Sequence, residues 1–173
     1  MKTVFLDRDG VLNQAIIRDG KPYAPTSLSE MIIPEEVLPA LLQLKAAGFL
    51  LIVATNQPDV IRGVTTKETV EAINRKLLNS LPLDDIMVCY HDDACGCACR
   101  KPKPGLLLQA AQRHNIDYIQ SFMIGDRCKD IAAGFSAGCK TILLECGYNE
   151  PQCEPLPDYV ATSIAHAVQW ILH

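Results

Sequence analysis

Two acidic residues stand two positions apart near the start of this chain, directly after a short apolar run. Asp7 and Asp9 follow Val4-Phe5-Leu6, and Gly10 comes next. In an extended chain, residues i and i+2 point to the same side. A turn at Gly10 would leave both carboxylates at the carboxyl edge of a sheet, where open α/β sheets place their ligands. Such a pair could bind a hard cation, or one carboxylate could attack while the other handles the proton. The same residues could also form only a strand followed by an acidic turn, without a chemical role.

Three further groups of polar side chains follow later apolar runs. They are Thr55-Asn56-Gln57, Arg100-Lys101-Pro102 and Gly125-Asp126. Each group alone has an ordinary structural explanation; Asp126, for instance, could simply cap the next helix. In a parallel α/β sheet, however, all strand ends share one edge, so a nucleophile, a hydroxyl, a cation and a distant acid would converge there. The order and the positions of the four groups make the pattern specific.

Phosphoryl transfer is the chemistry that this set would serve. A phosphate monoester carries about two negative charges near neutral pH. Mg²⁺ held by Asp7, Asp126 and one backbone carbonyl could neutralise it, with Lys101 as a point charge. Asp7 would attack phosphorus, and Asp9 would protonate the leaving oxygen and later deprotonate water. The Thr55 hydroxyl and the amides after it would cradle the phosphate.

Short apolar segments alternate with helical patterns and would position these groups. Such alternation predicts right-handed βαβ units, hence a parallel sheet with helices on both faces. We expect helices with inner faces at Leu38, Leu41 and Leu42, and at Val70, Ile73, Leu77 and Leu81, the second opened by a capping box at Thr65-x-x-Glu68. Residues 14–34 are expected to be an ordered excursion. The predicted strands are Thr3–Leu6, Phe49–Thr55, Ile86–Tyr90, Ser121–Ile124, Lys140–Leu144 and a short sixth at Tyr159–Ala161.

Length and composition limit the possible classes of protein. A chain of 173 residues with 49% hydrophobic residues is most simply one domain, spanning 1–173. Its net charge of −4 argues against binding to nucleic acid through phosphate contacts. No secretory leader and no apolar run long enough to span a membrane are evident, so we expect a cytoplasmic protein. The pattern shows no large apolar surface, which favours a monomer.

Eight cysteines in such a protein are more consistent with a metal site than with disulfides. Residues 89–99 offer Cys89, His91, Cys95, Cys97 and Cys99 as five candidates for the four places of a structural Zn²⁺ site. Zinc would close this loop and hold the cations that follow it. The other four, Cys128, Cys139, Cys146 and Cys153, show no ligand spacing; we expect Cys139 in the core and the rest as free, reduced thiols.

The motifs D-x-D-G, T-N-Q, R-K-P and G-D-R-x-x-D, in this order, resemble those of the haloacid dehalogenase (HAD) superfamily of phosphohydrolases. The resemblance covers the whole chain and implies a Rossmann-like fold, the roles given above, and the Asp9 main-chain carbonyl as a Mg²⁺ ligand. Each interval between motifs has room for one helix, so a capless enzyme with a zinc loop is expected. Asp130 could orient Lys101 or lie on the helix surface.

Within the superfamily, the Cys-x-His and Cys-x-Cys pairs before Arg-Lys-Pro resemble the zinc loop of heptose bisphosphate and histidinol phosphate phosphatases. That resemblance selects Cys89, His91, Cys97 and Cys99 and leaves Cys95 out, although Cys95 could replace Cys97. Asp-Arg-Asp-Gly-Val-Leu-Asn13 and Gly-Asp-Arg127 resemble the heptose enzymes. This implies Asn56, Gln57, Arg100 and Arg127 in substrate binding. It also implies hydrolysis of the 7-phosphate of D-glycero-D-manno-heptose 1,7-bisphosphate, for nucleotide-heptose and lipopolysaccharide precursors.

Two departures weaken the choice of sugar. The zinc loop has the short spacing of histidinol phosphate phosphatases, and the segment 15–28 is unlike that of the heptose enzymes. Histidinol phosphate is therefore the alternative substrate. Its amine is cationic, and only Asp19 and Asp59 offer acidic receptors for it. A silent, zinc-stabilised binding module is the alternative of a different class.

Overall fold

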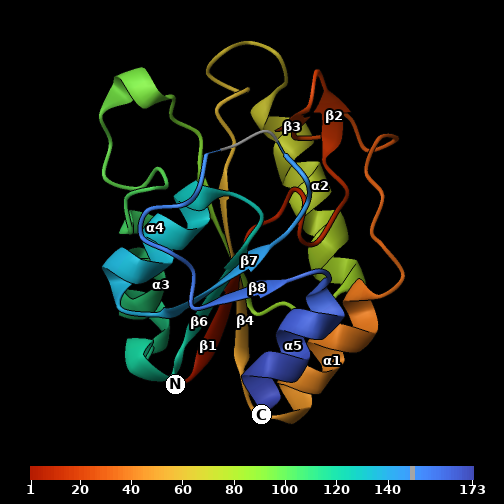
Figure 1. Ribbon diagram of the computed structural model, residues 1–173. Coiled ribbons are helices and arrows are strands. Elements are labelled where there is room, and N and C mark those ends of the chain that lie inside the picture. Colours follow the sequence, from red (N-terminus) through yellow and green to blue (C-terminus); the bar gives the residue numbers. More distant parts are fainter. Residues whose placement is uncertain (149–150) are drawn as a thin grey trace.

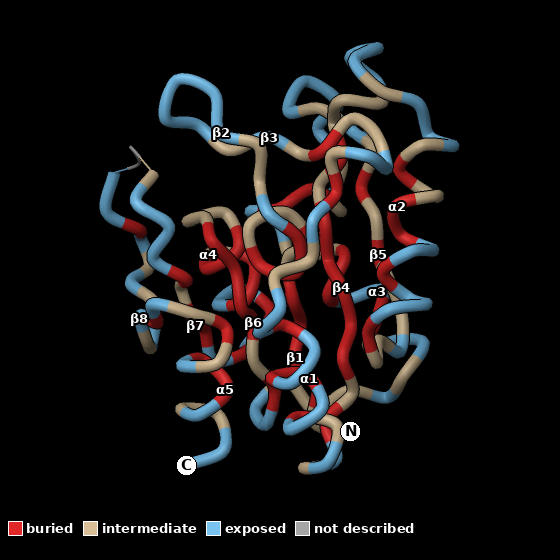
Figure 2. Tube along the Cα trace, turned by 90° about the vertical axis from the view of Figure 1, so that its right-hand side faces the viewer, coloured by how far each residue is buried: buried red, intermediate tan, exposed pale blue. Residues whose placement is uncertain are grey.

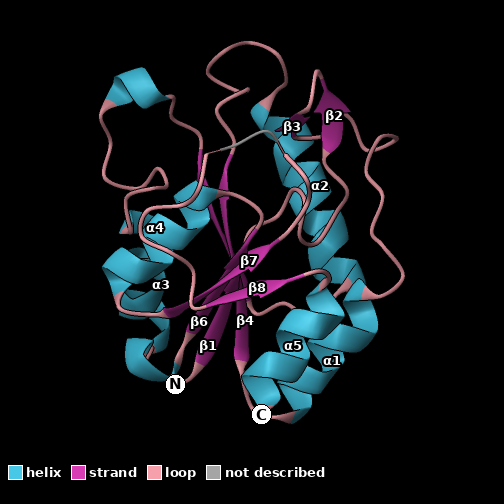
Figure 3. Cartoon of the chain, viewed as in Figure 1, coloured by secondary structure: helices cyan, strands magenta, loops and turns pink. Residues whose placement is uncertain are grey.

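The computed structural model describes residues 1–148 and 151–173 and contains a parallel sheet of six strands (Figure 1, Figure 3). The order across the sheet is β5-β4-β1-β6-β7-β8, so the first strand lies near the middle. The six predicted strands are confirmed, with bounds that differ by one residue at most. They are β1 (Thr3–Leu6), β4 (Leu50–Asn56), β5 (Asp85–Cys89), β6 (Phe122–Gly125), β7 (Lys140–Leu144) and β8 (Tyr159–Ala161).

Helices cover both faces of the sheet, as the alternating pattern predicts (Figure 1). One face carries α1 (Val37–Ala46), α2 (Lys67–Ser80) and α5 (Ile164–Leu172); the other carries α3 (Gly105–His114) and α4 (Cys128–Ala137). Strand residues alternate between the two layers. Val4 and Leu6 of β1 pack in the first layer, and Phe5 packs in the second. The whole of β1 is buried (Figure 2). Among the described helices, none has the length and apolar character needed to cross a membrane.

Three loops rise above the carboxyl edge of the sheet, where the polar motifs lie (Figure 1). The first contains a small hairpin, β2 (Ile16–Arg18) and β3 (Lys21–Tyr23). The second joins β4 to α2, and the third follows β5 and includes the 3-10 turn η1 (Asp93–Cys95). A further 3-10 turn, η2 (Tyr118–Gln120), precedes β6. The hairpin is part of the segment 14–34, which we expected to be an ordered excursion but to which we assigned no strands.

Two helix details differ from prediction. In α1 the buried residues are Val37, Ala40, Leu41 and Leu44, whereas Leu38 and Leu42 are 41% and 51% exposed. The helix is apolar on most of its circumference, so the spacing alone did not identify its inner face. The cap of α2 is Thr66, whose hydroxyl accepts from the Thr69 amide, rather than Thr65. The predicted inner face of α2 at Val70, Ile73, Leu77 and Leu81 is confirmed.

The cysteine prediction is wrong at one pair. Cys128, at the start of α4, forms a disulfide with Cys153. The two residues are 25 positions apart in sequence, and the irregular segment after β7 returns toward the end of β6, which brings their Cα atoms to 4.9 Å. No ligand-type spacing links them, so the sequence pattern did not reveal the pair. Cys139 is buried as expected, and Cys146 is a free thiol.

Candidate active site

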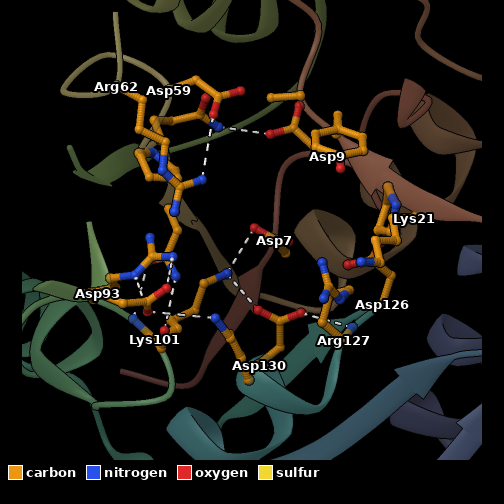
Figure 4. Close-up of a pocket in the computed structure, with 18 residues that line it drawn as sticks. Asp7, Asp9, Lys21, Asp59, Arg62, Asp93, Lys101, Asp126, Arg127 and Asp130 are labelled. Carbon is orange, nitrogen blue, oxygen red and sulfur yellow. Dashed lines mark hydrogen bonds and ion pairs between the residues drawn. The ribbon is translucent and has the colours of Figure 1, made fainter. Parts of the chain in front are cut away.

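A buried lysine connects two carboxylates at the end of the central strand. Lys101 Nζ lies 2.8 Å from Asp7 Oδ1 and 2.6 Å from Asp130 Oδ1 (Figure 4). Burial alone would lower the pKa of Lys101, but the charges of Asp130 and Asp7 outweigh it and raise that pKa. Lys101 is therefore a permanent cation. Asp130 is 1% exposed, so of the two roles considered for it, orienting Lys101 is the one that the structure supports.

Two glycines let these carboxylates approach. Gly125 ends β6, and a Cβ added there would lie 2.1 Å from the Asp130 Cβ. Gly10 has φ +90°, and a Cβ there would lie 2.0 Å from Asp126 Oδ2. Any side chain at either position would displace an acid of the site. The turn expected at Gly10 therefore needs a glycine for two reasons: the positive φ of the backbone, and the lack of space for a side chain beside Asp126.

The third carboxylate, Asp126, has little compensation from the protein. It is 5% exposed, and neither of its oxygens has a hydrogen-bond partner of normal geometry within the described residues. Burial, with the nearby charges of Asp7 and Asp130, raises the pKa of Asp126 well above its usual range. Burial also raises the pKa of Asp7 to about 6, against the opposing effect of Lys101. Crowded, poorly compensated carboxylates are a favourable environment for a cation.

Asp9 is held in one orientation by three side chains. Gln57 Nε2 donates to Asp9 Oδ2 at 2.7 Å, and Asn13 Nδ2 donates to Oδ1 at 3.0 Å. The fully buried Arg8 pairs with the same carboxylate and donates from Nη1 to Asn74 Oδ1 at 3.0 Å. Sequence reasoning missed Arg8, because a buried arginine is rare and nothing in the pattern distinguishes it from a surface residue.

The predicted T-N-Q residues lie together at the end of β4 but form different hydrogen bonds. Thr55 is buried, and its Oγ1 accepts from Gln57 Nε2 at 2.9 Å, which leaves the hydroxyl hydrogen free to donate. Asn56 exchanges two hydrogen bonds with the main chain of Lys101, at 3.0 and 3.1 Å. The side-chain amides of Asn56 and Gln57 are therefore both hydrogen-bonded to other residues of the site, and Asn56 fixes the position of Lys101.

A cavity of about 300 Å³ opens above this floor. On one side of it, Arg100 donates to Asp93 from Nε at 2.8 Å and from Nη2 at 3.3 Å, and Arg62 pairs with Asp92. Arg127 lines the other side, next to Asp126 (Figure 4). The structure thus brings all the predicted catalytic and substrate-binding residues to one region. Asp93, Arg62, Lys21 and Lys129 also line the cavity, although the sequence reasoning did not assign them a role.

A second cluster lies in the loop after β5. The ligand atoms of Cys89, His91, Cys97 and Cys99 all lie within 4.8 Å of one another, and Cys95 is exposed outside the group. Individual separations run from 3.1 Å (Cys89 to Cys99) to 3.7 Å (Cys89 to Cys97). Sulfur ligands about 2.3 Å from a tetrahedral zinc ion would be about 3.8 Å apart. Burial and the adjacent thiols raise the pKa of Cys89 to about 12, whereas hydrogen bonds outweigh burial and lower the pKa of Cys97 to about 7. A bound cation would favour the thiolate form of both groups.

Known proteins with this fold and site define a class. A HAD-hydrolase-like family model matches residues 98–167. The solved structure of D,D-heptose 1,7-bisphosphate phosphatase from Bordetella bronchiseptica, complexed with magnesium and phosphate, has a TM-score of 0.82 and 32% identity, and the match covers 99% of this chain and 98% of that one. Since relatives of up to 39% identity also cover most of the sequence, the chain belongs to the HAD-like phosphatases.

The relatives narrow the class further. A D-glycero-beta-D-manno-heptose-1,7-bisphosphate 7-phosphatase from Helicobacter pylori is 39% identical over 149 residues, which is 83% of each chain. The enzyme of the same name from Pasteurella multocida is 39% identical over 158 residues, covering 84% of this chain and 83% of its own length. The family model does not reach Asp7 or Thr55, because it matches only residues 98–167. The similarity to these enzymes, in contrast, extends over most of the length of the chain.

Proposed function

We propose that this phosphatase removes the 7-phosphate of D-glycero-D-manno-heptose 1,7-bisphosphate. The observation that carries the reaction is the pair formed by Asp7 and the buried Lys101, 2.8 Å apart at the floor of a cavity lined by six basic and six acidic side chains. The observation that favours the sugar is the similarity to relatives named for that substrate. Heptose 1-phosphate would be the product, for use in nucleotide-heptose and lipopolysaccharide precursor synthesis.

The first half of the reaction transfers the phosphoryl group to the enzyme. A carboxylate oxygen of Asp7 attacks phosphorus, the bond from phosphorus to the sugar oxygen breaks, and an aspartyl-phosphate forms. Asp9 gives its proton to the departing sugar oxygen. Lys101 and the free hydrogen of the Thr55 hydroxyl stabilise the charge on the phosphoryl oxygens.

The second half regenerates the enzyme. Asp9, now ionised, takes a proton from water as the water oxygen attacks phosphorus, and the bond to Asp7 breaks. Inorganic phosphate leaves and the Asp7 carboxylate is restored. The clamp of Arg8, Asn13 and Gln57 on Asp9 keeps one carboxylate in place for both proton transfers.

Two metal ions complete the proposal. Mg²⁺ would be held by Asp7, Asp126 and the main-chain carbonyl of Asp9, and it would offset the negative charge of the substrate phosphate. Asp126 supports this choice, because its buried oxygens lack protein partners of normal geometry in the described structure. Zn²⁺ would be held by Cys89, His91, Cys97 and Cys99. Its place immediately before Arg100 and Lys101 supports a role in positioning these cations rather than in activating water.

Histidinol phosphate is less well supported as a substrate. Its cationic amine needs a free acid near the cavity. Asp59 lines the cavity but pairs with Arg62 at 3.7 Å, and Asp19 is not among the lining residues. Arg100 and Arg127 offer instead two cations for a second phosphate, with the planar guanidinium geometry that suits it.

Phosphate release from a panel of substrates tests the proposal. The panel is the α- and β-anomers of heptose 1,7-bisphosphate, fructose 1,6-bisphosphate and histidinol phosphate, each with Mg²⁺. We expect a preference of about a hundredfold in kcat/KM for one heptose anomer. A preference for histidinol phosphate, or equal rates on all four, would remove the heptose assignment and leave the aspartyl-phosphate chemistry in place.

A further inference from the structure

The β2–β3 hairpin forms one wall of the active-site cavity, although it lies outside the parallel sheet. Lys21, Pro22 and Tyr23 of this hairpin line the cavity. In Figure 4, Lys21 lies across the cavity from Arg62 and Asp93, and Asp7 lies on the floor between them. The hairpin thus places one cation at the rim, on the side opposite the zinc loop.

Lys21 differs from the other cations of the cavity in its pairing. Its side chain makes no ion pair or hydrogen bond within the described residues. Arg127 has interactions of its own, including the bond from its main-chain amide to Asp130. The remaining cations on the wall each have an acidic partner: Arg62 pairs with Asp92, Arg100 and Lys129 share Asp93, and Lys101 pairs with Asp7 and Asp130.

This difference in pairing decides what each cation offers to a dianionic ligand. Asp93 already pairs with Arg100 and Lys129, so a phosphate that binds either cation must compete with a carboxylate already in place. Lys101 is 2% exposed at the floor, where only the phosphate under attack can reach it. Lys21 is an exposed, uncompensated charge at the rim, and it can meet a second phosphate without the loss of an existing ion pair.

The hairpin is built to hold Lys21 in place. Asp19 and Gly20 connect its strands with φ values of 50° and 72°, the positive values that a type I′ turn requires. Arg18 and Lys21 face each other in the ladder through their main chains, which fixes where the Lys21 side chain leaves the hairpin. Beyond the hairpin, the Thr65 hydroxyl donates to the Thr26 carbonyl at 3.4 Å, which joins this segment to the loop before α2.

From these observations we infer that Lys21 determines specificity by binding the phosphate of the substrate that is not transferred. The inference rests on the proposed function, since it needs a substrate with two phosphates. It assigns the recognition of the second phosphate to the hairpin, in addition to Arg100 and Arg127. The enzyme would then distinguish a bisphosphate from a monophosphate partly by a charge that lies outside the floor formed by the carboxylates and Lys101.

Two substrates that differ only in the second phosphate give the sharpest test. Heptose 1,7-bisphosphate and heptose 7-phosphate are compared with the wild type, Lys21→Ala, Lys21→Arg and Arg18→Ala. We expect Lys21→Ala to lower kcat/KM for the bisphosphate about tenfold more than for the monophosphate, through KM rather than kcat. Lys21→Arg should restore most of the difference. Arg18→Ala removes the same charge from the same hairpin but not from the cavity wall, and should leave the ratio of the two substrates unchanged.

The results separate this inference from the proposed function. If the wild type prefers the bisphosphate and Lys21→Ala leaves that preference intact, or lowers both rates equally, Lys21 does not read the second phosphate and the proposed function stands. The same holds if Arg18→Ala reduces the preference as much as Lys21→Ala, because the effect is then one of general charge. A wild type without any preference for the bisphosphate would overturn the proposed function and this inference together.

Discussion

Among the residues that the structure describes, two clusters are suited to metal ions, and they are assembled in opposite ways. The carboxylate cluster of Asp7, Asp126 and Asp130 joins residues more than a hundred positions apart, at the ends of β1 and β6 and in α4. The sulfur cluster of Cys89, His91, Cys97 and Cys99 comes from eleven consecutive residues of one loop. The first is positioned by the fold, whereas the second must position its own loop.

This difference predicts different roles: the carboxylate cluster for the reaction itself, and the sulfur cluster for the support of the neighbouring loop. The acids of the carboxylate cluster lie at the ends of β1 and β6 and in α4, so their positions persist whenever the sheet is folded. The loop of the sulfur cluster has few buried apolar residues beyond the four candidate ligands, so we expect its geometry to depend on a bound ion. Loss of Mg²⁺ should therefore stop turnover without changing the structure, whereas loss of Zn²⁺ should change the structure and reduce turnover as a consequence.

The largest expected effect comes from the nucleophile. Asp7→Asn removes the attacking oxygen, and we expect kcat to fall by about a thousandfold or more. The fold should remain, because the sheet positions this residue, and circular dichroism and thermal unfolding provide the control. Turnover within about tenfold of wild type would show that Asp7 does not attack phosphorus. An unchanged biological phenotype despite lost turnover would favour a binding module.

The sulfur cluster offers a matched pair of cysteine variants. Cys99→Ala should lose zinc, measured by elemental analysis, and should lower kcat/KM by about 10- to 100-fold as Arg100 and Lys101 lose their support. Cys95→Ser should keep both zinc and activity, because Cys95 lies outside the cluster. Full activity in a zinc-free Cys99→Ala protein would mean that the loop does not depend on the ion. Loss of zinc from Cys95→Ser would place Cys95 among the ligands.

The two outer carboxylates should differ in their response to magnesium. Asp126→Asn should raise the Mg²⁺ concentration for half-maximal activity by about tenfold, because Asp126 would be a ligand. Asp130→Asn should lower kcat and cost about 3 kcal/mol of unfolding free energy through the broken pair with Lys101, but leave the Mg²⁺ requirement nearly unchanged. Activity is measured in both variants as a function of the Mg²⁺ concentration. If the concentration for half-maximal activity rises more in Asp130→Asn than in Asp126→Asn, Asp130 is the metal ligand instead.

Cysteine labelling refines the comparison without any expected change in activity. In the native zinc-loaded protein, N-ethylmaleimide should modify only the exposed thiols, Cys95 and Cys146. A chelator should add the thiols of the sulfur cluster, while Cys128 and Cys153 stay protected by their disulfide until a reductant is present. Peptide mass spectrometry reads each site. Labelling of Cys128 before reduction would mean that the disulfide does not form in solution.

Much of the floor of the site could be predicted from the sequence, because the strand ends determine it. Asp7, Thr55 and Asp126 each sit at or just after a recognisable apolar strand, Lys101 lies in the segment that follows another, and parallel strands share an edge. Their convergence follows from the fold class without knowledge of any single contact. The roles of these residues in the reaction stay predictions until the variants above are measured.

The walls of the site were harder to predict, since they depend on contacts between loops. The pairing of Arg100 with Asp93 and the disulfide between Cys128 and Cys153 have no signature in spacing. The hairpin did have one: the dipeptide Asp19-Gly20 is typical of a type I′ turn. We assigned no strands to that segment because they are only three residues long and belong to no periodic pattern.

The two glycines beside the carboxylates have a consequence for mutational tolerance. In a library in which every position is replaced and activity is selected, Gly10 and Gly125 should accept as few substitutions as the acids themselves, although neither has a group that can react. A Cβ at either one would occupy the space of a neighbouring aspartate. A map of intolerant positions would therefore outline this active site partly through residues that contribute only empty volume.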